Sequence, residues 1–541
     1  MKASVQQIEV NTEELKLLVE RAREAPLEEA GCRKLNALIA TFEYLTQLLE
    51  NKQTTIQSLR QLLLKPSTEK TEKILQKAGL AASEKPSKPP GTKTPKKAKG
   101  HGRNSAESYK AAQKIEISHP LLKPGDNCPK CQEGKVYAQR QPGLLVRIVG
   151  QAPLAATVYE LERLRCNLCG DVFTAEAPER MGAKKYDETS ASMIALLKYG
   201  SGFPFYRLEG LQENLEIPLP AATQWEIVAA AATLIQPAMD ELIRQAAQGK
   251  VLHNDDTSMK VLGLMKEVAS AEGDSSDPPE RTGVFTSGIV STTDGQKIAL
   301  FFTGRKHAGE NLSTVLARRA PGLGPPIQMC DALSRNLPKP LQVILGYCLT
   351  HSRRRFVEVA PNFPSECRYV LEALGEIYHH DELAREQGMT PEERLCFHQA
   401  HSGPVMEKLH AWLTAQLEEK RVEPNSGLGQ AITYMRKHWE KLTLFLRQAG
   451  APLDNNLCER ALKKAILHRK NSLFYKTRNG ARVGDLYMSL IHTTELCGAN
   501  PFDYLTELQK HATDLQQNPR DWMPWNYRQS MERTGAAGLA A

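Results

Sequence analysis

The stretch that most constrains the fold is Val251–Thr257, a short apolar run that ends in two adjacent carboxylates. Charge beside a core is costly to desolvate, so a buried strand that delivers an acid at its end needs a chemical reason. Pro326–Asp331 is a second run of this kind, and Leu453–Arg460 has the pattern of a capped helix start with Glu459 in its first turns. One acid after a strand is more often a turn or capping residue. Three such positions in one chain favour a metal site.

Two strand-end aspartates, Asp255 and Asp331, and one helical glutamate, Glu459, are what a two-metal phosphoryl-transfer site requires. Hard carboxylate oxygens suit Mg²⁺ or Mn²⁺, which keep positions open for phosphate and water. One ion activates the attacking oxygen of an in-line displacement, and the other stabilises the leaving oxygen.

At these residues the chain resembles the DDE transposases of the insertion sequence 66 family, whose catalytic core has the ribonuclease-H-like fold. The resemblance runs over nearly the whole chain and is carried by His253–Thr257, Asp331, Cys348–Arg354, Asp454–Arg460 and Arg469–Phe474. The family usually has Ala-Asp-Glu-Thr where this chain has Asn-Asp-Asp-Thr. Asp255 therefore matches the family's metal ligand, while Asp256 becomes a competing candidate.

The resemblance implies an enzyme that binds the ends of its mobile element and joins them to target DNA. Asp255, Asp331 and Glu459 would be both the catalytic residues and the ligands of two Mg²⁺ or Mn²⁺ ions. Water would cut a strand at the element end, and the freed 3′-hydroxyl would attack the target by the same in-line chemistry. Accessory proteins of the same element are further expected partners. Two rivals stay open: a non-catalytic, zinc-containing DNA-binding regulator derived from a transposase, and a metal-dependent nuclease without strand transfer.

Basic residues near these acids are candidates for DNA contact, because arginine and lysine bind phosphate. They are Arg353, Arg354, Arg355, Lys463, Lys464, Arg469 and Lys470. On a helix, Lys463 and Lys470 fall within roughly 40° of Glu459, and the arc with Cys458 and Leu462 is expected to face the sheet, together with Ala461 and Ala465. A solvated helix face is the alternative. Cys348 and His351 could form half of a metal site, but no second pair lies nearby in the sequence, so a structural or positioning role is expected.

Residues 12–64 predict a helix with a heptad seam. Its positions are Leu35, Leu38, Phe42, Leu45, Leu49, Lys52, Ile56, Leu59 and Leu63. That spacing favours a coiled coil that makes the protein a homo-oligomer, although an amphipathic helix folded onto its own domain would show the same pattern. Residues 81–102, rich in Lys, Pro and Gly, indicate a disordered linker, which either follows DNA phosphates or is merely solvated.

Two Cys-x-x-Cys pairs predict one structural zinc ion. Cys128 and Cys131 form the first pair, and Cys166 and Cys169 form the second. Strands expected at 144–149 and 157–164 would bring the pairs together, and four thiolates suit tetrahedral Zn²⁺. The gap between the pairs is longer than in the commonest fingers, so the element is expected to be zinc-ribbon-like. Redox or coincidental cysteines are the alternative.

Residues 190–230 suggest three short helices with the outline of a helix-turn-helix, in which Pro204 opens the second and Pro220 precedes the third. Base reading would have to rest on Thr223 and Gln224, since the third helix has no Lys or Arg near its start. A plain helical support for the catalytic core is an equal alternative.

The core itself is expected to begin with three antiparallel strands, near 251–255, 284–291 and 297–303, the last two joined by an Asp-Gly turn. A helix near 308–319, a strand ending at Asp331 and another at 342–347 follow. This order matches the ribonuclease-H-like arrangement, with the antiparallel strands at one edge of a mixed sheet.

The chain is therefore expected to be a multidomain α+β protein. Its expected parts are a helical coiled-coil region (1–66), a basic linker (67–112), a zinc-ribbon-like domain (113–180), a helix-turn-helix-like region (181–249), a catalytic core in two parts (250–360 and 451–508), a helical insertion (361–450) and a C-terminal tail (509–541).

The net charge of +8 favours an anionic partner without proving one. No run of about 18 apolar residues predicts a membrane span, and the first residues lack the apolar core of a signal peptide. The cysteines outside the two pairs are scattered, which indicates reduced thiols. The protein is expected in the cytoplasm, on the bacterial nucleoid when bound to DNA.

Overall fold

The structure is a computed structural model. It describes residues 114–139, 145–148, 150–165, 167, 169, 171–178, 184–266, 281–293, 295–340 and 342–539. The predicted coiled coil (1–66), the basic linker (67–112) and Cys166 lie outside the described residues. The described chain divides into two units, residues 356–375 and the remainder. The remainder contains the sheet and all three predicted catalytic acids.

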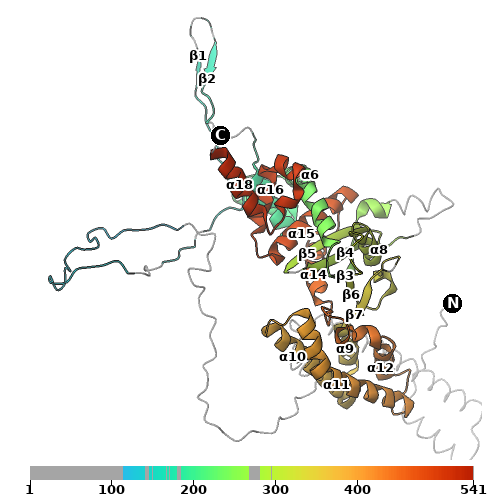
Figure 1. The fold of residues 1–541 in the computed structure, drawn as a ribbon. Helices are drawn as coiled ribbons and strands as arrows, with labels where there is room; N and C mark the ends of the chain where they lie inside the picture. Colours follow the sequence, from blue (N-terminus) through green and yellow to red (C-terminus); the bar gives the residue numbers. More distant parts are fainter. Residues whose placement is uncertain are drawn as a thin grey trace, which may run out of the picture. The chain divides into compact units, whose positions relative to one another are not determined.

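Five strands form a mixed sheet in the order β5-β4-β3-β6-β7 (Figure 1). They are β3 (Val251–Ser258), β4 (Phe285–Thr293), β5 (Gln296–Gly304), β6 (Ile327–Cys330) and β7 (Ile344–Tyr347). β3, β4 and β5 pair antiparallel, whereas β6 and β7 continue the sheet in parallel with β3. The predicted order, with the antiparallel strands at one edge, is confirmed.

The register of β3 against β4 decides which face each acid takes. Asp255 lies opposite Gly288, and Asp256 lies opposite Ser287. Successive side chains of a strand point to opposite faces of the sheet. Asp255 and Asp256 are therefore on different faces, although they are adjacent in the sequence.

Two helices cover these two faces of the sheet. On the face of Asp255 lies α14 (Asn456–Ser472), which packs on β3 and β4. A Cβ at Gly288 would lie 3.0 Å from the Leu462 side chain, so glycine allows the helix to approach closely. On the other face lies α8 (Ala308–Leu316), whose Asn311 donates from Nδ2 to the Ser287 hydroxyl at 2.9 Å.

The arc predicted to turn α14 toward the sheet is confirmed. Its buried residues are Cys458, Ala461, Leu462, Ala465 and His468. The helix predicted at 308–319 ends three residues early, at Leu316.

The edge strand β5 is covered by α15 (Arg478–Leu496), a helix that was not predicted from the sequence. Side chains of α15 spaced by four residues accept from backbone N–H groups of β5. Asp485 accepts from Thr303 (2.6 Å), Ser489 from Phe301 (2.9 Å) and Thr493 from Ala299 (3.1 Å). These contacts satisfy backbone N–H groups of the edge strand, which would otherwise be open to pairing with another strand.

The helices before the sheet begin where the prolines predicted. They are α4 (Glu188–Ala195), a π-helical turn (Leu196–Gly200), α5 (Phe205–Asn214) and α6 (Ala221–Ala246), with Pro204 and Pro220 at the N-caps of the last two. The third helix is not short, because α6 continues to Ala246 and packs on α15 and α4. Gln224 is fully buried and donates to the carbonyls of Phe205 and Leu219. Its amide therefore holds the turn and is not placed to read a base.

Helices fill the predicted insertion. They follow α9 (Leu349–Val359) and comprise α10 (Pro364–Glu386), α11 (Pro391–Glu418), α12 (Gly427–Lys437), α13 (Trp439–Leu442) and the 3-10 turn η5 (Leu444–Leu446).

The C-terminal residues are part of the packed structure. They form α16 (Pro501–Lys510), α17 (Ala512–Gln517), the 3-10 turn η6 (Pro519–Trp522) and α18 (Tyr527–Leu539). Trp522 is buried, and its carbonyl accepts from the Tyr504 hydroxyl at 2.9 Å. The expected tail thus packs on the helix that precedes it. Among the described residues, no helix is both long and apolar enough to span a membrane.

The cysteine-rich region contains a two-stranded hairpin, β1 (Arg163–Arg165) and β2 (Val172–Thr174). Residues 145–148 are not a strand, and only the end of the segment predicted at 157–164 is one. The hairpin instead brackets the second cysteine pair. At the first pair, the Gly134 N–H lies 3.5 Å from Sγ of Cys131, and this backbone donor is the main cause that lowers the pKa of the thiol. A lowered thiol pKa suits a zinc ligand.

Candidate active site

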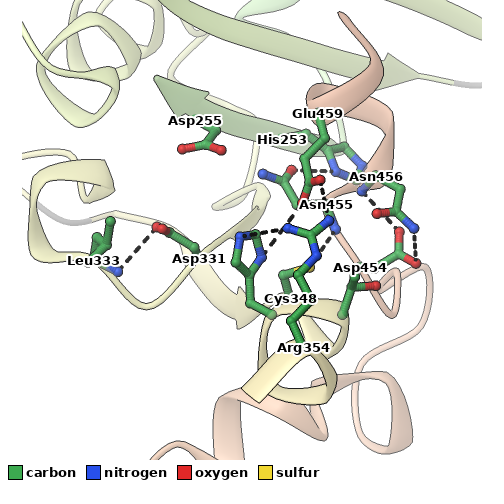
Figure 2. A network of polar contacts seen from close by, with 12 residues as sticks. His253, Asp255, Asp331, Leu333, Cys348, Arg354, Asp454, Asn455, Asn456 and Glu459 are labelled. Atoms are coloured by element: carbon green, nitrogen blue, oxygen red, sulfur yellow. Dashed lines mark hydrogen bonds and ion pairs between the residues drawn. The ribbon is translucent and has the colours of Figure 1, made fainter. Parts of the chain in front are cut away.

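Asp255 and Asp331 meet where β3 and the neighbouring strand β6 present their acids (Figure 2). Asp255 is the fifth residue of β3, and Asp331 directly follows β6. Because the two strands are parallel neighbours, acids near their carboxyl ends come to the same edge of the sheet. Burial, followed by the charge of Asp331, raises the pKa of Asp255 to about 7. Such crowding of carboxylates favours a bound cation.

Asn336 joins the two aspartates. It ends the 3-10 turn η4 (Ser334–Asn336), and its Nδ2 donates to Oδ1 of Asp331 and, at 3.4 Å, to Oδ1 of Asp255. Its own carbonyl accepts from the side-chain amides of Asn254 (2.8 Å) and Gln328 (2.7 Å). Asn336 was not predicted from the sequence, because a polar residue in a turn five positions after Asp331 belongs to no periodic pattern.

The geometry distinguishes Asp255 from its competitor Asp256. The Asp256 side chain is 1% exposed and accepts from Nδ1 of His307 at 2.8 Å, with Arg335 at 3.4 Å from its other oxygen. These partners belong to the face covered by α8. Asp256 is thus engaged by His307 and Arg335, whereas Asp255 faces Asp331.

Glu459 lies in the first turn of α14, as predicted, with 22% of its side chain exposed. Its Oε2 accepts from the Arg354 guanidinium at 2.6 Å (Figure 2). Its Oε1 lies 3.7 Å from Nδ1 of His351. Cys348, His351 and Glu459 also place their ligand atoms within 4.8 Å of one another. Within the described residues, Glu459 shares no hydrogen bond with Asp255 or Asp331.

Asn455 fixes the start of α14 against β3. The Nδ1–H of His253 donates to its Oδ1 at 3.2 Å, and its Nδ2 donates to the Asn254 carbonyl at 3.1 Å. Its backbone N–H also contacts Sγ of Cys348 at 3.2 Å. Burial lowers the pKa of His253 to about 4, so this imidazole is neutral and serves as a hydrogen-bond donor. One residue therefore ties together the elements that carry Asp255, Glu459 and Cys348.

Three of the predicted phosphate-binding arginines have different surroundings. Arg353 is 2% exposed and lies over the Tyr378 ring at 5.2 Å, so it is not accessible to a phosphate. Arg354 binds Glu459, and the exposed Arg355 stacks on Tyr434 at 3.9 Å. Only the last two arginines are accessible to a phosphate.

The basic residues of α14 also separate into two groups. Lys463 and Lys470 are exposed, which both the predicted DNA contact and a solvated helix face require. Lys464 instead binds Glu495 at 2.9 Å, and Arg469 donates to the Thr257 hydroxyl at 3.0 Å, which ties α14 to the end of β3.

The acids fit divalent cations. Each aspartate has one oxygen held by protein donors. Oδ1 of Asp255 accepts from the Asp256 N–H, and Oδ1 of Asp331 accepts from the Leu333 N–H. In the described part of the chain, the Oδ2 atoms of Asp255 and Asp331 have no hydrogen-bond partner. Oxygen-only donors with open positions suit Mg²⁺ or Mn²⁺.

Comparison with known proteins agrees with this geometry. Residues 185–483 match the family described as Transposase IS66 family. The chain belongs to this family. The matched span contains the whole sheet and all three acids, while the cysteine pairs precede it. No solved structure matches the chain.

Relatives of this IS66 family member occur in Sinorhizobium fredii. The uncharacterized protein y4jD is 26% identical over 385 residues, which cover 68% of this chain and 71% of the relative. The uncharacterized protein y4hP is 23% identical over 444 residues, which cover 78% of this chain and 77% of the relative. Both relatives are described without an activity, so they add none to the family assignment.

Proposed function

We propose that the protein is a DDE transposase that binds the ends of its mobile element, cuts DNA there and joins it to a target. The observation that carries this proposal is the pairing of Asp255 with Asp331 on the sheet face that α14, the helix of Glu459, covers. The strand order of the sheet supports a ribonuclease-H-like core. Together with the family assignment, these features favour phosphoryl transfer on DNA over a purely structural role.

Asp255, Asp331 and Glu459 would hold two Mg²⁺ or Mn²⁺ ions, which supply activation of the attacking oxygen and charge stabilisation at the leaving oxygen. Asp255 and Asp331 are already held together by Asn336, so little reorganisation is required of them. Glu459 must exchange Arg354 for the cation. Arg354, once released, would remain beside the site as a partner for a DNA phosphate.

Exposed cations on neighbouring elements would hold the DNA backbone. Lys463 and Lys470 lie on the same helix as Glu459, and Arg355 follows Arg354 on α9. Such contacts position DNA without reading its sequence. A structural zinc ion held by Cys128, Cys131, Cys166 and Cys169 would organise the region before the core, and the N-terminal heptads would pair protomers so that two element ends meet.

The test is incubation of the purified protein with labelled element-end DNA, target DNA and Mn²⁺, with and without accessory proteins of its element. A joined product is expected. Asp255→Asn, Asp331→Asn and Glu459→Gln should each abolish it, because each removes a charge at nearly constant shape.

Asp256→Asn is the matched control, since Asp256 lies on the opposite face and is engaged by His307. Joining by this variant and none by Asp255→Asn is the expected result. The reverse would transfer the role to Asp256. Cleavage without joining would identify a nuclease, and DNA binding without either reaction would identify a regulator.

A further inference from the structure

Asn336 occupies an unusual place for an amide. It is fully buried, and its Nδ2 donates to carboxylate oxygens of both Asp331 and Asp255. Two carboxylates that converge on one donor define a point of negative potential. The amide nitrogen therefore lies where a positively charged ligand of the two aspartates would be most stable.

The other end of the same amide is unsatisfied. Oδ1 of Asn336 is buried and has no hydrogen-bond partner among the described residues. A buried polar atom without a partner is uncommon in folded proteins and calls for an explanation. Because this oxygen has no such partner, turning the amide would break no hydrogen bond at that end.

The backbone of Asn336 is held firmly while its amide can turn. The carbonyl accepts from Asn254 and Gln328, and Gln328 also donates to Oδ1 of Asn254 at 2.8 Å. Rotation of an amide by half a turn exchanges its donor and its acceptor at nearly constant shape. Such a rotation would bring Oδ1 of Asn336 to the two aspartates without displacing the turn.

We propose that Asn336 is a further ligand of the divalent cation held by Asp255 and Asp331. Without the cation, its Nδ2 bridges the aspartates. With the cation bound, the amide is turned and its Oδ1 completes the set of oxygen ligands. Amide oxygens are ordinary ligands of hard divalent cations. The inference rests on the proposed function, because it requires a cation between these aspartates.

The competing role for Asn336 is that of a donor that only positions the two carboxylates. Replacement by cysteine distinguishes the roles, because a thiolate ligand shifts metal preference toward soft ions such as Cd²⁺. Asn336→Cys is compared with the parent protein and with Leu333→Cys. Leu333 belongs to the same loop, is 45% exposed and contacts Asp331 through its backbone.

Affinities for Cd²⁺ and Mn²⁺ are measured by calorimetry on the full chain without DNA. The ratio of Cd²⁺ affinity to Mn²⁺ affinity is expected to be about tenfold higher for Asn336→Cys than for Leu333→Cys. Changes to the residues around a bound metal typically alter its affinity by about this factor or more. A ratio equal to that of Leu333→Cys overturns the assignment of Asn336 alone. A parent protein that does not bind Mn²⁺ removes the proposed site together with this ligand, because Cd²⁺ alone can be bound by the four cysteines of the predicted zinc site.

A second measurement needs no cysteine variant and so covers the case in which Asn336→Cys fails to fold. The parent protein is labelled with ¹³C in its asparagine side-chain amides and loaded with Mn²⁺. Pulsed electron-nuclear double resonance should detect a ¹³C coupling to the ion. The same coupling should be lost in Asn336→Leu, which leaves the other labelled asparagines in place. Absence of any coupling in the metal-loaded parent overturns the proposal.

Discussion

Replacing Asp255 by asparagine should stabilise the metal-free protein while removing its metal response. The pKa of Asp255 is raised from 3.8 to about 7 by burial and by Asp331. Each pKa unit corresponds to about 1.4 kcal/mol, so a shift of roughly three units sets an upper bound of about 4 kcal/mol on the cost of ionising this group. Asp255 is not fully buried, so solvent screens part of this cost and an effect of about 1–2 kcal/mol is expected.

The pH dependence follows from the sign of this shift. Because the folded-state pKa is above the unfolded one, the ionisation cost is absent below about pH 4, increases between pH 4 and 7 and is complete above pH 7. The gain in stability from Asp255→Asn should therefore be absent below about pH 4 and complete above pH 7. Asp256→Asn should instead lose stability at pH 8, since it breaks the contacts with His307 and Arg335.

Thermal unfolding of chelator-treated protein at pH 5 and pH 8 provides the assay, and a rise of roughly 2–4 °C at pH 8 is expected for Asp255→Asn. Adding Mn²⁺ at about 100 times its dissociation constant should stabilise the parent by about 2.7 kcal/mol and the variant by much less. The reasoning would be refuted if Asp255→Asn were no more stable than the parent at pH 8. It would also be refuted if the melting temperature of the variant differed from that of the parent by the same amount at pH 5 and at pH 8.

Three further predictions concern regions outside the acid cluster. Lys463→Ala and Lys470→Ala should each weaken binding to matched and unrelated DNA by similar factors. Each should also reduce the slope of log affinity against log salt concentration by about one unit, and unchanged slopes in a salt titration would show that this helix face does not contact DNA. Cys131→Ser should lower the zinc content from one ion per chain, measured by elemental analysis of protein purified without added metal; a parent free of zinc would contradict the site. Leu45→Asp combined with Leu49→Asp should dissociate protomers, whereas an unchanged mass by light scattering would indicate an ordinary amphipathic helix.

Much of the core could be predicted from local pattern. The alternating and apolar runs predicted the starts of β3, β4 and β5 to within one residue, although β3 continues three residues past its predicted end at Asp255. The spacing of Cys458 and Leu462 predicted which arc of α14 is buried. The prolines at 204 and 220 marked helix starts because proline suits the first turn and excludes the preceding residue from the helix. Prediction was poorer at the cysteine-rich hairpin, whose short strands β1 and β2 are exposed and have no buried face to impose a pattern.

Local residue types thus determined the strands and helices, because strand and helix periodicity are properties of neighbouring residues. They also indicated Asp255, Asp331 and Glu459 as candidate metal ligands. Only the tertiary structure distinguished Asp255 from Asp256 as the candidate metal ligand. The two side chains lie on opposite faces of the sheet, and the fold places His307 beside Asp256 and Asp331 beside Asp255. The tertiary structure also showed that Asn336 contacts both aspartates and that Arg353 is buried. These roles depend on contacts between residues distant in the chain, such as the 81 positions that separate Asn336 from Asp255, and no local pattern encodes such contacts.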